Sequence, residues 1–244
     1  MPVRSAGRIT NAEGTVGERA WPALLAEGVG TFLFFFVGAG SVVLTTYAGG
    51  GGPGLVGIAL AHGLVLAVLV SALGVVSGAH FNPAVTFGLW IAGKIEGPLG
   101  VGYVVAQLIG GVLAGLALRA TFSPDVWGPT NIGTPALGAQ ISPAIGIGVE
   151  AVLTVILLLV VFGTIVDDRA PQIGGLAVGL AVAADILVGG PLTGAAMNPA
   201  RWFGPALAAT AFNDWYVWIV GPLLGALVAA LLYRFAFAEE PEPA

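Results

Sequence analysis

Long apolar runs make up most of the chain, and short polar or glycine-rich segments separate them. An α-helix rises about 1.5 Å per residue, so roughly 20 apolar residues cross the hydrocarbon core of a bilayer. The runs are continuous rather than alternating, which argues against a membrane β-barrel. The pattern predicts six transmembrane helices, over residues 21–44, 55–76, 99–120, 141–165, 173–189 and 215–237.

Two shorter apolar segments, 83–92 and 199–209, fall outside these runs. Each begins at the proline of an Asn-Pro-Ala motif, where asparagine is a favoured N-cap and proline a favoured first helical residue. A helix of about ten residues is roughly 15 Å long, half of a roughly 30 Å hydrocarbon core. We therefore expect two re-entrant half-helices. The motif residues are Asn82, Pro83, Ala84, Asn198, Pro199 and Ala200.

The two Asn-Pro-Ala motifs belong to an internal repeat. Gly-Ala stands four and three residues before each asparagine, and Phe-Gly follows each motif after two further residues. Segments 27–31 and 150–154 also match, each beginning with Glu and ending with Thr. Each copy holds three spans and one half-helix, so the expected fold class is an all-α membrane protein with an inverted 3+3 repeat. The halves cover about 21–122 and 141–237, and the working site lies near the midplane.

Composition supports a membrane protein and removes several function classes. Hydrophobic residues make up 57% of the chain and charged residues only 9%, against about 25% charged residues in a soluble domain. The chain has no cysteine, so it forms no disulfide or thiolate metal site. No nucleophile–base pair, metal cluster or phosphate loop is visible. We expect no enzyme activity, metal, cofactor or nucleic-acid partner, and a lipid bilayer as surroundings.

The positions of lysine and arginine predict the orientation. The connections 45–54 and 121–140 carry no lysine or arginine, whereas the opposite connections and the two terminal segments each carry at least one. We expect a multi-pass protein of the cell membrane with cytoplasmic tails at 1–20 and 238–244. The first half-helix then enters from the cytoplasm and the second from outside. The basic residues are Arg4, Arg8, Arg19, Lys94, Arg169 and Arg234.

Half-helices that enter from opposite faces meet with their N-termini at mid-membrane. Each N-terminus carries roughly half a positive charge, so the meeting point repels cations and protons. Asn82 and Asn198 can offer amide donors to a passing neutral oxygen. Irregular backbone at this depth must be buried or line a water-filled cavity, so segments 77–81 and 194–197 are expected to present carbonyls along one.

The chain resembles the aquaporins of the major intrinsic protein family over residues 20–237. The resemblance rests on Ser-Gly-Ala-His-Phe-Asn-Pro-Ala-Val-Thr at 77–86, on Asn-Pro-Ala-Arg at 198–201, and on Glu27 and Glu150. It implies a right-handed bundle of six helices with two half-helices and one pore through each chain. It also implies a homotetramer whose channel domain, residues 21–237, conducts water and small neutral solutes.

Arg201 is a basic residue set deep in an apolar segment. A charge at mid-bilayer costs at least about 2.5–3.5 kcal/mol, so its side chain must face a polar cavity or snorkel to the interface. The resemblance places Arg201 in the outer constriction, with His62, Ile186 and Ala195 as the other members of the selectivity filter. This set is similar to that of tonoplast intrinsic proteins.

The expected filter predicts the range of solutes. Water-selective members of the resembling family usually have an aromatic residue and a histidine at the positions of His62 and Ile186. Ile186 and Ala195 remove a donor and bulk, so we expect ammonia, urea, hydrogen peroxide and glycerol to pass beside water. A water-selective channel is the alternative. Trp202 stands where glycerol facilitators have an acidic residue, which disfavours a dedicated glycerol channel. A packing role is the alternative for His62.

Two buried carboxylates are expected in the spans. Glu27 and Glu150 either relay protons, as intramembrane carboxylates do in transporters, or accept hydrogen bonds from the backbone of the re-entrant segments. Their matching positions in the repeat favour the structural role. Gln107 is expected to support the same packing.

Asp185 has no counterpart in the other half of the repeat, and His80 lies two residues before Asn82. Asp185 is expected to bond loop backbone, or else to approach His62 and make permeation pH-dependent, because histidine titrates near 6.5. His80 is expected to border the inner mouth, with gating as an alternative. Asp185 also leaves open an ion-coupled secondary transporter, and a structural membrane protein with a closed pore is the third class.

Overall fold

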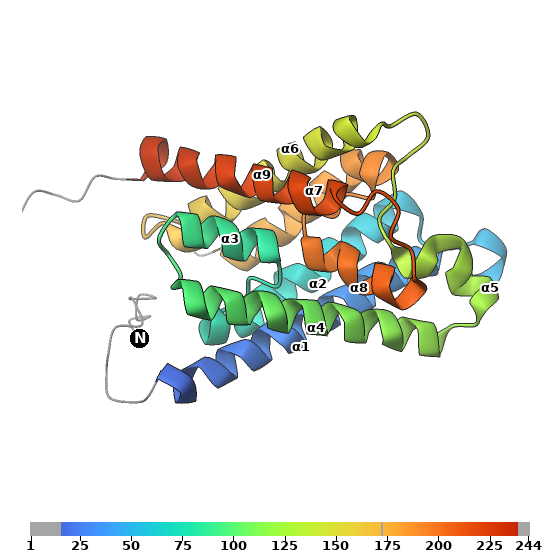
Figure 1. Ribbon diagram of the computed structural model, residues 1–244, viewed down its shortest axis with the longest axis horizontal. Helices are drawn as coiled ribbons and strands as arrows, with labels where there is room; N and C mark the ends of the chain where they lie inside the picture. Colours follow the sequence, from blue (N-terminus) through green and yellow to red (C-terminus); the bar gives the residue numbers. More distant parts are fainter. Residues whose placement is uncertain (1–15, 172, 239–244) are drawn as a thin grey trace, which may run out of the picture.

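The computed structural model describes residues 16–171 and 173–238. Within this part of the chain the regular structure is helical (Figure 1), and six helices are long and apolar enough to cross a membrane. Most of the two expected tails, 1–20 and 238–244, lies outside the described residues. The long helices are α1 (Val16–Val43), α2 (Gly54–Ser77), α4 (Gly97–Thr121), α6 (Pro143–Val161), α7 (Gly174–Thr193) and α9 (Val217–Leu232).

The shorter elements include both expected half-helices, α3 (Pro83–Ile91) and α8 (Pro199–Ala209). Helices α6 and α9 each continue into a π-helical turn, Phe162–Val166 and Tyr233–Phe237. The connection between α4 and α6, for which the sequence predicts no structure, contains α5 (Pro124–Trp127) and a 3₁₀ turn at Gly128–Gly133.

Helices α2 and α7 end at equivalent glycines of the repeat. Gly78 has φ 84° and Gly194 has φ 79°, a left-handed conformation that glycine adopts without a steric penalty and that commonly ends a helix. The sequence predicts an end at Gly189, just before Gly190 and Pro191. This boundary is wrong, since α7 continues through Pro191 and stops only at the left-handed Gly194.

The packing follows the inverted repeat. Helix α1 packs on α2 and α4, and their repeat equivalents α6, α7 and α9 pack in the same way. Each half-helix crosses to the other half, because α3 packs on α9 and α8 packs on α4. The two halves therefore interlock, and this arrangement brings the Asn-Pro-Ala motifs to the centre of the bundle (Figure 1).

Close contact between α2 and α7 joins the two halves. A Cβ atom added at Gly179 would lie 2.3 Å from the Gly63 carbonyl oxygen, and one added at Gly63 would lie 2.6 Å from the Gly179 oxygen. No side chain fits at either position. Small residues of this kind allow membrane helices to approach closely.

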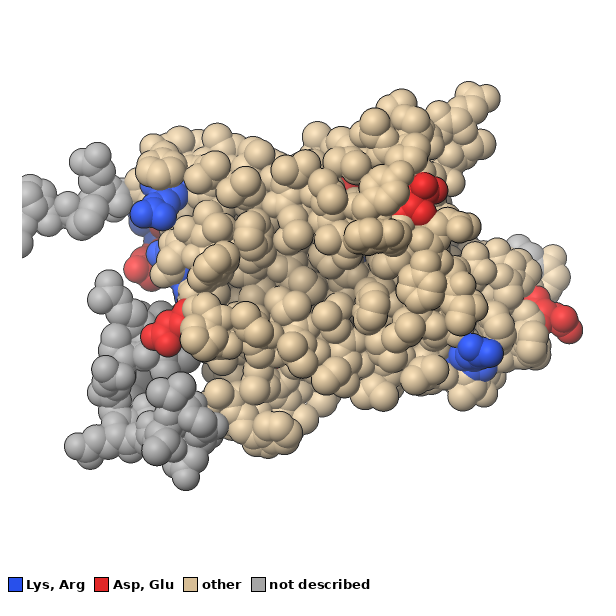
Figure 2. All heavy atoms as spheres, viewed as in Figure 1, with Lys and Arg blue, Asp and Glu red and all other residues tan. Residues whose placement is uncertain are grey.

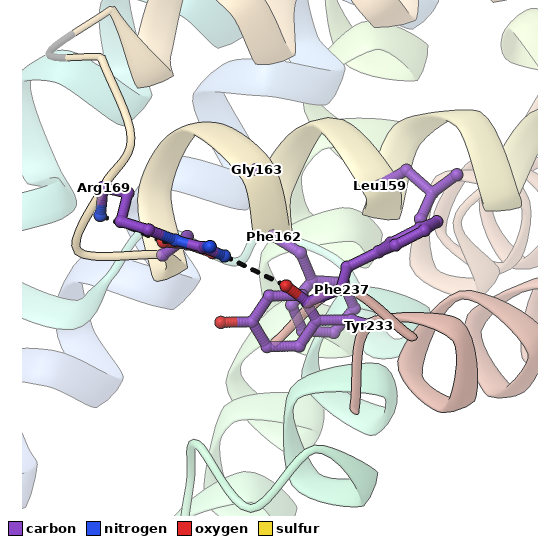
Figure 3. A pocket seen from close by; sticks show the side chains of 7 residues that line it. Leu159, Phe162, Gly163, Arg169, Tyr233 and Phe237 are labelled. Atoms are coloured by element: carbon purple, nitrogen blue, oxygen red, sulfur yellow. Dashed lines mark hydrogen bonds and ion pairs between the residues drawn. The ribbon is translucent and has the colours of Figure 1, made fainter. Parts of the chain in front are cut away.

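The described chain starts and ends at the same end of the bundle (Figure 1). Lysine and arginine side chains gather there, on the left of Figure 2. The Nζ atom of Lys94 lies 5.7 Å from the ring centroid of Tyr233. Arg169 donates to the Phe237 carbonyl oxygen at 3.0 Å. Figure 3 shows a hollow at this end, between the ends of α6 and α9, and the residues of the expected filter do not line it.

Candidate functional site

The two motif asparagines cap the half-helices. The Asn82 Oδ1 atom accepts a hydrogen bond from the Ala84 backbone N–H at 2.8 Å. The Asn198 Oδ1 atom accepts from the N–H groups of Ala200 and Arg201 at 3.0 and 3.3 Å. Since each oxygen satisfies N–H groups at the helix start, the amide nitrogens are directed away from the helices.

The amide nitrogens tie the two motifs to each other. Asn82 Nδ2 donates to the Met197 carbonyl, and Asn198 Nδ2 donates to the Phe81 carbonyl, both at 2.9 Å. These reciprocal bonds hold the half-helices N-terminus to N-terminus. An NH₂ group has two hydrogens, and within the described residues each asparagine nitrogen has one acceptor, so one hydrogen remains on each.

The segments before the asparagines share an unusual backbone. Ala79 and Phe81 have φ of 52° and 47°, and their equivalents Ala195 and Met197 have 46° and 52°. Side-chain-bearing residues rarely adopt positive φ, and such strain persists only where the surroundings enforce it. Two buried glutamates supply the enforcing contacts.

Glu27 is fully buried and accepts four hydrogen bonds. Its Oε1 atom accepts from the Ser77 hydroxyl at 2.7 Å and from the His80 N–H at 2.9 Å. Its Oε2 atom accepts from the Phe81 N–H at 2.7 Å and from Gln107 Nε2 at 2.8 Å. The carboxylate thus gathers the backbone donors of the first re-entrant segment.

Glu150 occupies the equivalent place in the second half and is also fully buried. Its Oε1 atom accepts from the Thr193 hydroxyl at 2.7 Å and the Ala196 N–H at 2.9 Å, and its Oε2 atom from the Met197 N–H at 2.7 Å. The sequence does not by itself predict a role for Ser77 or Thr193. It does contain a signal for both, because each precedes the repeated Gly-Ala by one residue.

Arg201 and His62 form a buried pair above the motifs. Arg201, which is 4% exposed, donates from Nη1 to the Gly133 carbonyl at 2.9 Å and from Nε to His62 Nε2 at 3.2 Å. The arginine therefore does not snorkel. His62 Nδ1 lies 2.9 Å from the Ile58 carbonyl. Because guanidinium only donates and a carbonyl only accepts, these partners assign a neutral imidazole that carries its proton on Nδ1.

The other two residues of the expected filter are apolar and buried. Ile186 and Ala195 are 3% and 4% exposed and belong to the central apolar cluster of the bundle. Ala195 directly follows the left-handed Gly194. The structure joins Arg201 to His62 by a hydrogen bond, whereas Ile186 and Ala195 have no polar side-chain atom with which to join them.

The Gly133 carbonyl is a partner of Arg201 that the sequence does not reveal. It lies in the connection between α4 and α6, far along the chain from either motif. A backbone carbonyl leaves no side-chain signature in a sequence. Only the tertiary structure could identify this contact.

Asp185 does not make a hydrogen bond of the expected kind. Within the described part of the chain, none joins its carboxylate to loop backbone or to His62, whose ring nitrogens face Ile58 and Arg201. The carboxylate is 3% exposed, and its Oδ2 atom has no hydrogen-bond partner among the described residues. Its helix α7 packs on α2 and α6, so Asp185 is buried in the bundle without a polar contact for that oxygen.

His80 lies beside the Glu27 network. Its Nδ1 atom is 3.0 Å from the Thr86 hydroxyl, and its ring contacts that of Tyr103 edge to face. Gln107 Nε2 donates to the same Thr86 hydroxyl at 3.0 Å as well as to Glu27. His80 and Gln107 therefore share one polar cluster below the first motif.

Comparison with known proteins gives one family. The sequence model described as "Major intrinsic protein" matches residues 16–233. The chain is 48% identical over 231 residues to "Aquaporin TIP4-4" of Zea mays, covering 91% of this chain and 90% of that protein. It is 41% identical over 227 residues to "Aquaporin TIP2-1" of Arabidopsis thaliana, covering 90% and 89%.

A solved structure agrees with the sequence relatives. The X-ray structure of the aquaglyceroporin from Plasmodium falciparum matches with a TM-score of 0.77 and 26% identity, covering 89% of this chain and 96% of that one. Together with the six spans and the two interlocked half-helices, these matches show that the chain belongs to the major intrinsic protein family.

Proposed function

We propose that the chain is a passive channel for water and small neutral solutes that excludes protons and ions. The observation that carries the proposal is the pair of half-helices joined N-terminus to N-terminus by Asn82 and Asn198. This arrangement puts two positive helix ends and two amide donors at the centre of a six-span bundle. Membership of the family supports the same function.

The proposed path begins at a ring of His62, Ile186, Ala195 and Arg201. A solute sheds water there, because Arg201 replaces part of its hydration with guanidinium donors. Solutes then pass in single file and accept hydrogen bonds from the remaining amide hydrogens of Asn82 and Asn198. The fixed charge of Arg201 and the two opposed helix ends repel cations, so selectivity combines width, lining donors and an electrostatic barrier.

The proposed solutes are water, ammonia, urea, hydrogen peroxide and glycerol. The side chains of Ile186 and Ala195 offer no hydrogen bond, so we infer that one side of the ring is less polar and tolerates solutes larger than water. Relatives are named aquaporins, and a structural neighbour is named an aquaglyceroporin. Trp202 stands directly after Arg201, where glycerol facilitators have an acidic residue, and this difference disfavours a dedicated glycerol channel.

Stopped-flow light scattering on proteoliposomes tests the proposal, with water, glycerol, urea and ammonia compared. The first prediction concerns Arg201→Val, which removes the donors to His62 and Gly133. We expect urea and glycerol permeability to rise relative to water, together with cation leak. Arg119→Val is the matched control, because Arg119 also donates to a backbone carbonyl, that of Ala208, but lies outside the proposed ring.

Two outcomes contradict the proposal. Permeability no greater than that of bare lipid leaves a structural protein with a closed pore. Solute uptake driven by a proton gradient favours the second candidate, an ion-coupled transporter, for which the unpartnered Oδ2 atom of Asp185 is the specific observation. In that case Asp185→Asn abolishes the coupling, whereas a passive channel keeps its gradient-independent flux.

We further propose a homotetramer with both termini on the cytoplasmic face of its membrane. The common end of the described chain and the basic residues there support this orientation. The chain is a multi-pass integral membrane protein. The two relatives described above are of the TIP type, so they do not support the prediction of a cell-membrane protein. Chemical crosslinking in detergent tests the tetramer through the number of copies joined.

A further inference from the structure

Three consecutive residues in the connection between α4 and α6 adopt a left-handed backbone. Asn131 has φ 48° and ψ 49°, Ile132 has φ 58° and ψ 31°, and Gly133 has φ 71°. Asparagine and glycine adopt this conformation readily, whereas a β-branched residue there is a steric outlier. The strain at Ile132 is therefore held by something outside its own backbone.

The side chain of Ile132 supplies the hold. It is fully buried in a small apolar cluster with Ala39 of α1, Leu118 of α4 and Ala208 of α8. The backbone beside it is just as confined, because a Cβ atom added at Gly133 would lie 2.6 Å from the Ala39 carbonyl oxygen. Ile132 thus pins this connection against three helices.

The left-handed backbone of residues 131–133 ends at a contact with the proposed constriction. The residue after Ile132 is Gly133, whose carbonyl accepts from Arg201 Nη1 at 2.9 Å. The guanidinium has one other protein partner among the described residues, His62 Nε2 at 3.2 Å. The left-handed backbone that Ile132 holds sets the direction of the Gly133 carbonyl. This carbonyl is one of the two hydrogen-bond partners of the Arg201 guanidinium, so the position of Arg201 depends on the same backbone.

We propose that Ile132 is a positioning residue for the constriction and sets the selectivity of the channel through the Gly133 carbonyl and Arg201. The proposal rests on the proposed function, because it needs Arg201 to line the path. Ile132 itself touches no solute. When its side chain is lost, the carbonyl turns away, Arg201 keeps only the contact to His62, and the constriction becomes wider and less well defined.

The test compares Ile132→Ala with Ile132→Val in proteoliposomes. Alanine keeps a Cβ atom, so the left-handed backbone stays unfavourable, but it removes the buried anchor, whereas valine keeps a β-branched apolar side chain in the cluster. The readout is the ratio of glycerol to water permeability, which does not depend on how much protein folds. Leu158→Ala is the matched control, because Leu158 is also fully buried but lies on α6 outside this cluster.

We expect Ile132→Ala to raise the ratio by about tenfold, the scale set by one lost hydrogen bond to a charged group. Ile132→Val should stay near the wild-type ratio, and Leu158→Ala should lower all permeabilities in parallel. An unchanged ratio in Ile132→Ala overturns this inference while leaving the channel intact. A wild-type protein without water permeability overturns the proposed function instead. A ratio change in Leu158→Ala as large as in Ile132→Ala assigns Ile132 a merely structural role.

Discussion

At the scale of single residues, two buried glutamates explain how strained backbone survives in the middle of a membrane. Glu27 and Glu150 together accept four backbone N–H groups, two in each re-entrant segment. These N–H groups lie outside the helices but within the membrane-spanning bundle, so each would otherwise be left unpaired at a cost of several kcal/mol. The two carboxylates therefore have a structural role: they stabilise the backbone of the re-entrant segments.

The second prediction is that Glu150→Gln lowers the thermal stability. Its three donors need two acceptor oxygens, and glutamine replaces one oxygen with an NH₂ group that faces an N–H or hydroxyl donor. Leaving a buried donor unsatisfied costs about 1–3 kcal/mol, and Glu150→Ala, which strands all three donors, should cost more. Thermal unfolding in detergent measures both, with the exposed Glu96→Gln as control. Equal melting temperatures for Glu150→Gln and Glu96→Gln would contradict the structural role.

The third prediction exchanges the two variable positions of the constriction. In His62→Phe combined with Ile186→His, phenylalanine adds bulk and histidine restores a donor on the other side of the ring. We expect glycerol and urea flux to fall while water flux remains, because the ring becomes narrower and more polar. Stopped-flow ratios measure this, with Ile186→Val as an aliphatic control. Retained glycerol and urea flux in the double variant would refute the assignment of His62 and Ile186 to the constriction.

At the scale of helices, the fold depends on close approaches that leave no space for side chains. Helices α2 and α7 meet at Gly63 and Gly179, where each carbonyl lies against the other glycine. The half-helix α8 meets α4 in the same way, since a Cβ atom at Gly204 would lie 2.3 Å from the Gly111 carbonyl oxygen. Both contacts join the first half of the chain to the second.

The fourth prediction is that Gly179→Val prevents stable folding. A valine Cβ atom would meet the Gly63 backbone and force α2 and α7 apart, and overpacking of this kind typically costs about 1–3 kcal/mol or more. Gly74→Ala in α2 is the control, because an added Cβ there meets nothing within 4 Å. Alanine is a better helix former than glycine, so that variant should be at least as stable as the parent. Size-exclusion chromatography in detergent checks both, and a monodisperse, heat-stable Gly179→Val would show that the close approach is dispensable.

At the scale of the whole molecule, the inverted repeat determines where the two half-helices meet. Each half sends its half-helix into the other half, so the central site exists only when both halves are assembled. The same topology returns the last described residues to the end where the first ones start (Figure 1). Orientation in the membrane then follows from the basic residues at that end.

The fifth prediction concerns this orientation. The chain has no cysteine, so single cysteines can be introduced without background. Ala139→Cys lies in the connection before α6, and Asp168→Cys lies in the connection between α6 and α7, both at exposed positions. In intact cells that carry the protein in the plasma membrane, a membrane-impermeant maleimide should label Ala139→Cys and not Asp168→Cys. Labelling of Asp168→Cys alone would reverse the proposed orientation.

The sequence by itself determined the helices, because apolar length and the Asn-Pro turn are local properties. It predicts the six spans, two half-helices and the repeat, and these predictions of the fold are confirmed. The ends of the helices are harder to predict from sequence, as α7 shows. The glycines and Pro191 weaken a helix locally, whereas packing within the bundle decides where it ends.

Only the tertiary structure decided which atoms meet. The pairing of Arg201 with His62 and with the Gly133 carbonyl joins three segments that are far apart in sequence. Among the described residues Asp185 Oδ2 has no hydrogen-bond partner, and this too depends on the surroundings rather than on the residue type. The physical reason is the same in each case: residue type records what a side chain can donate or accept, whereas distance and backbone direction arise only when the helices pack.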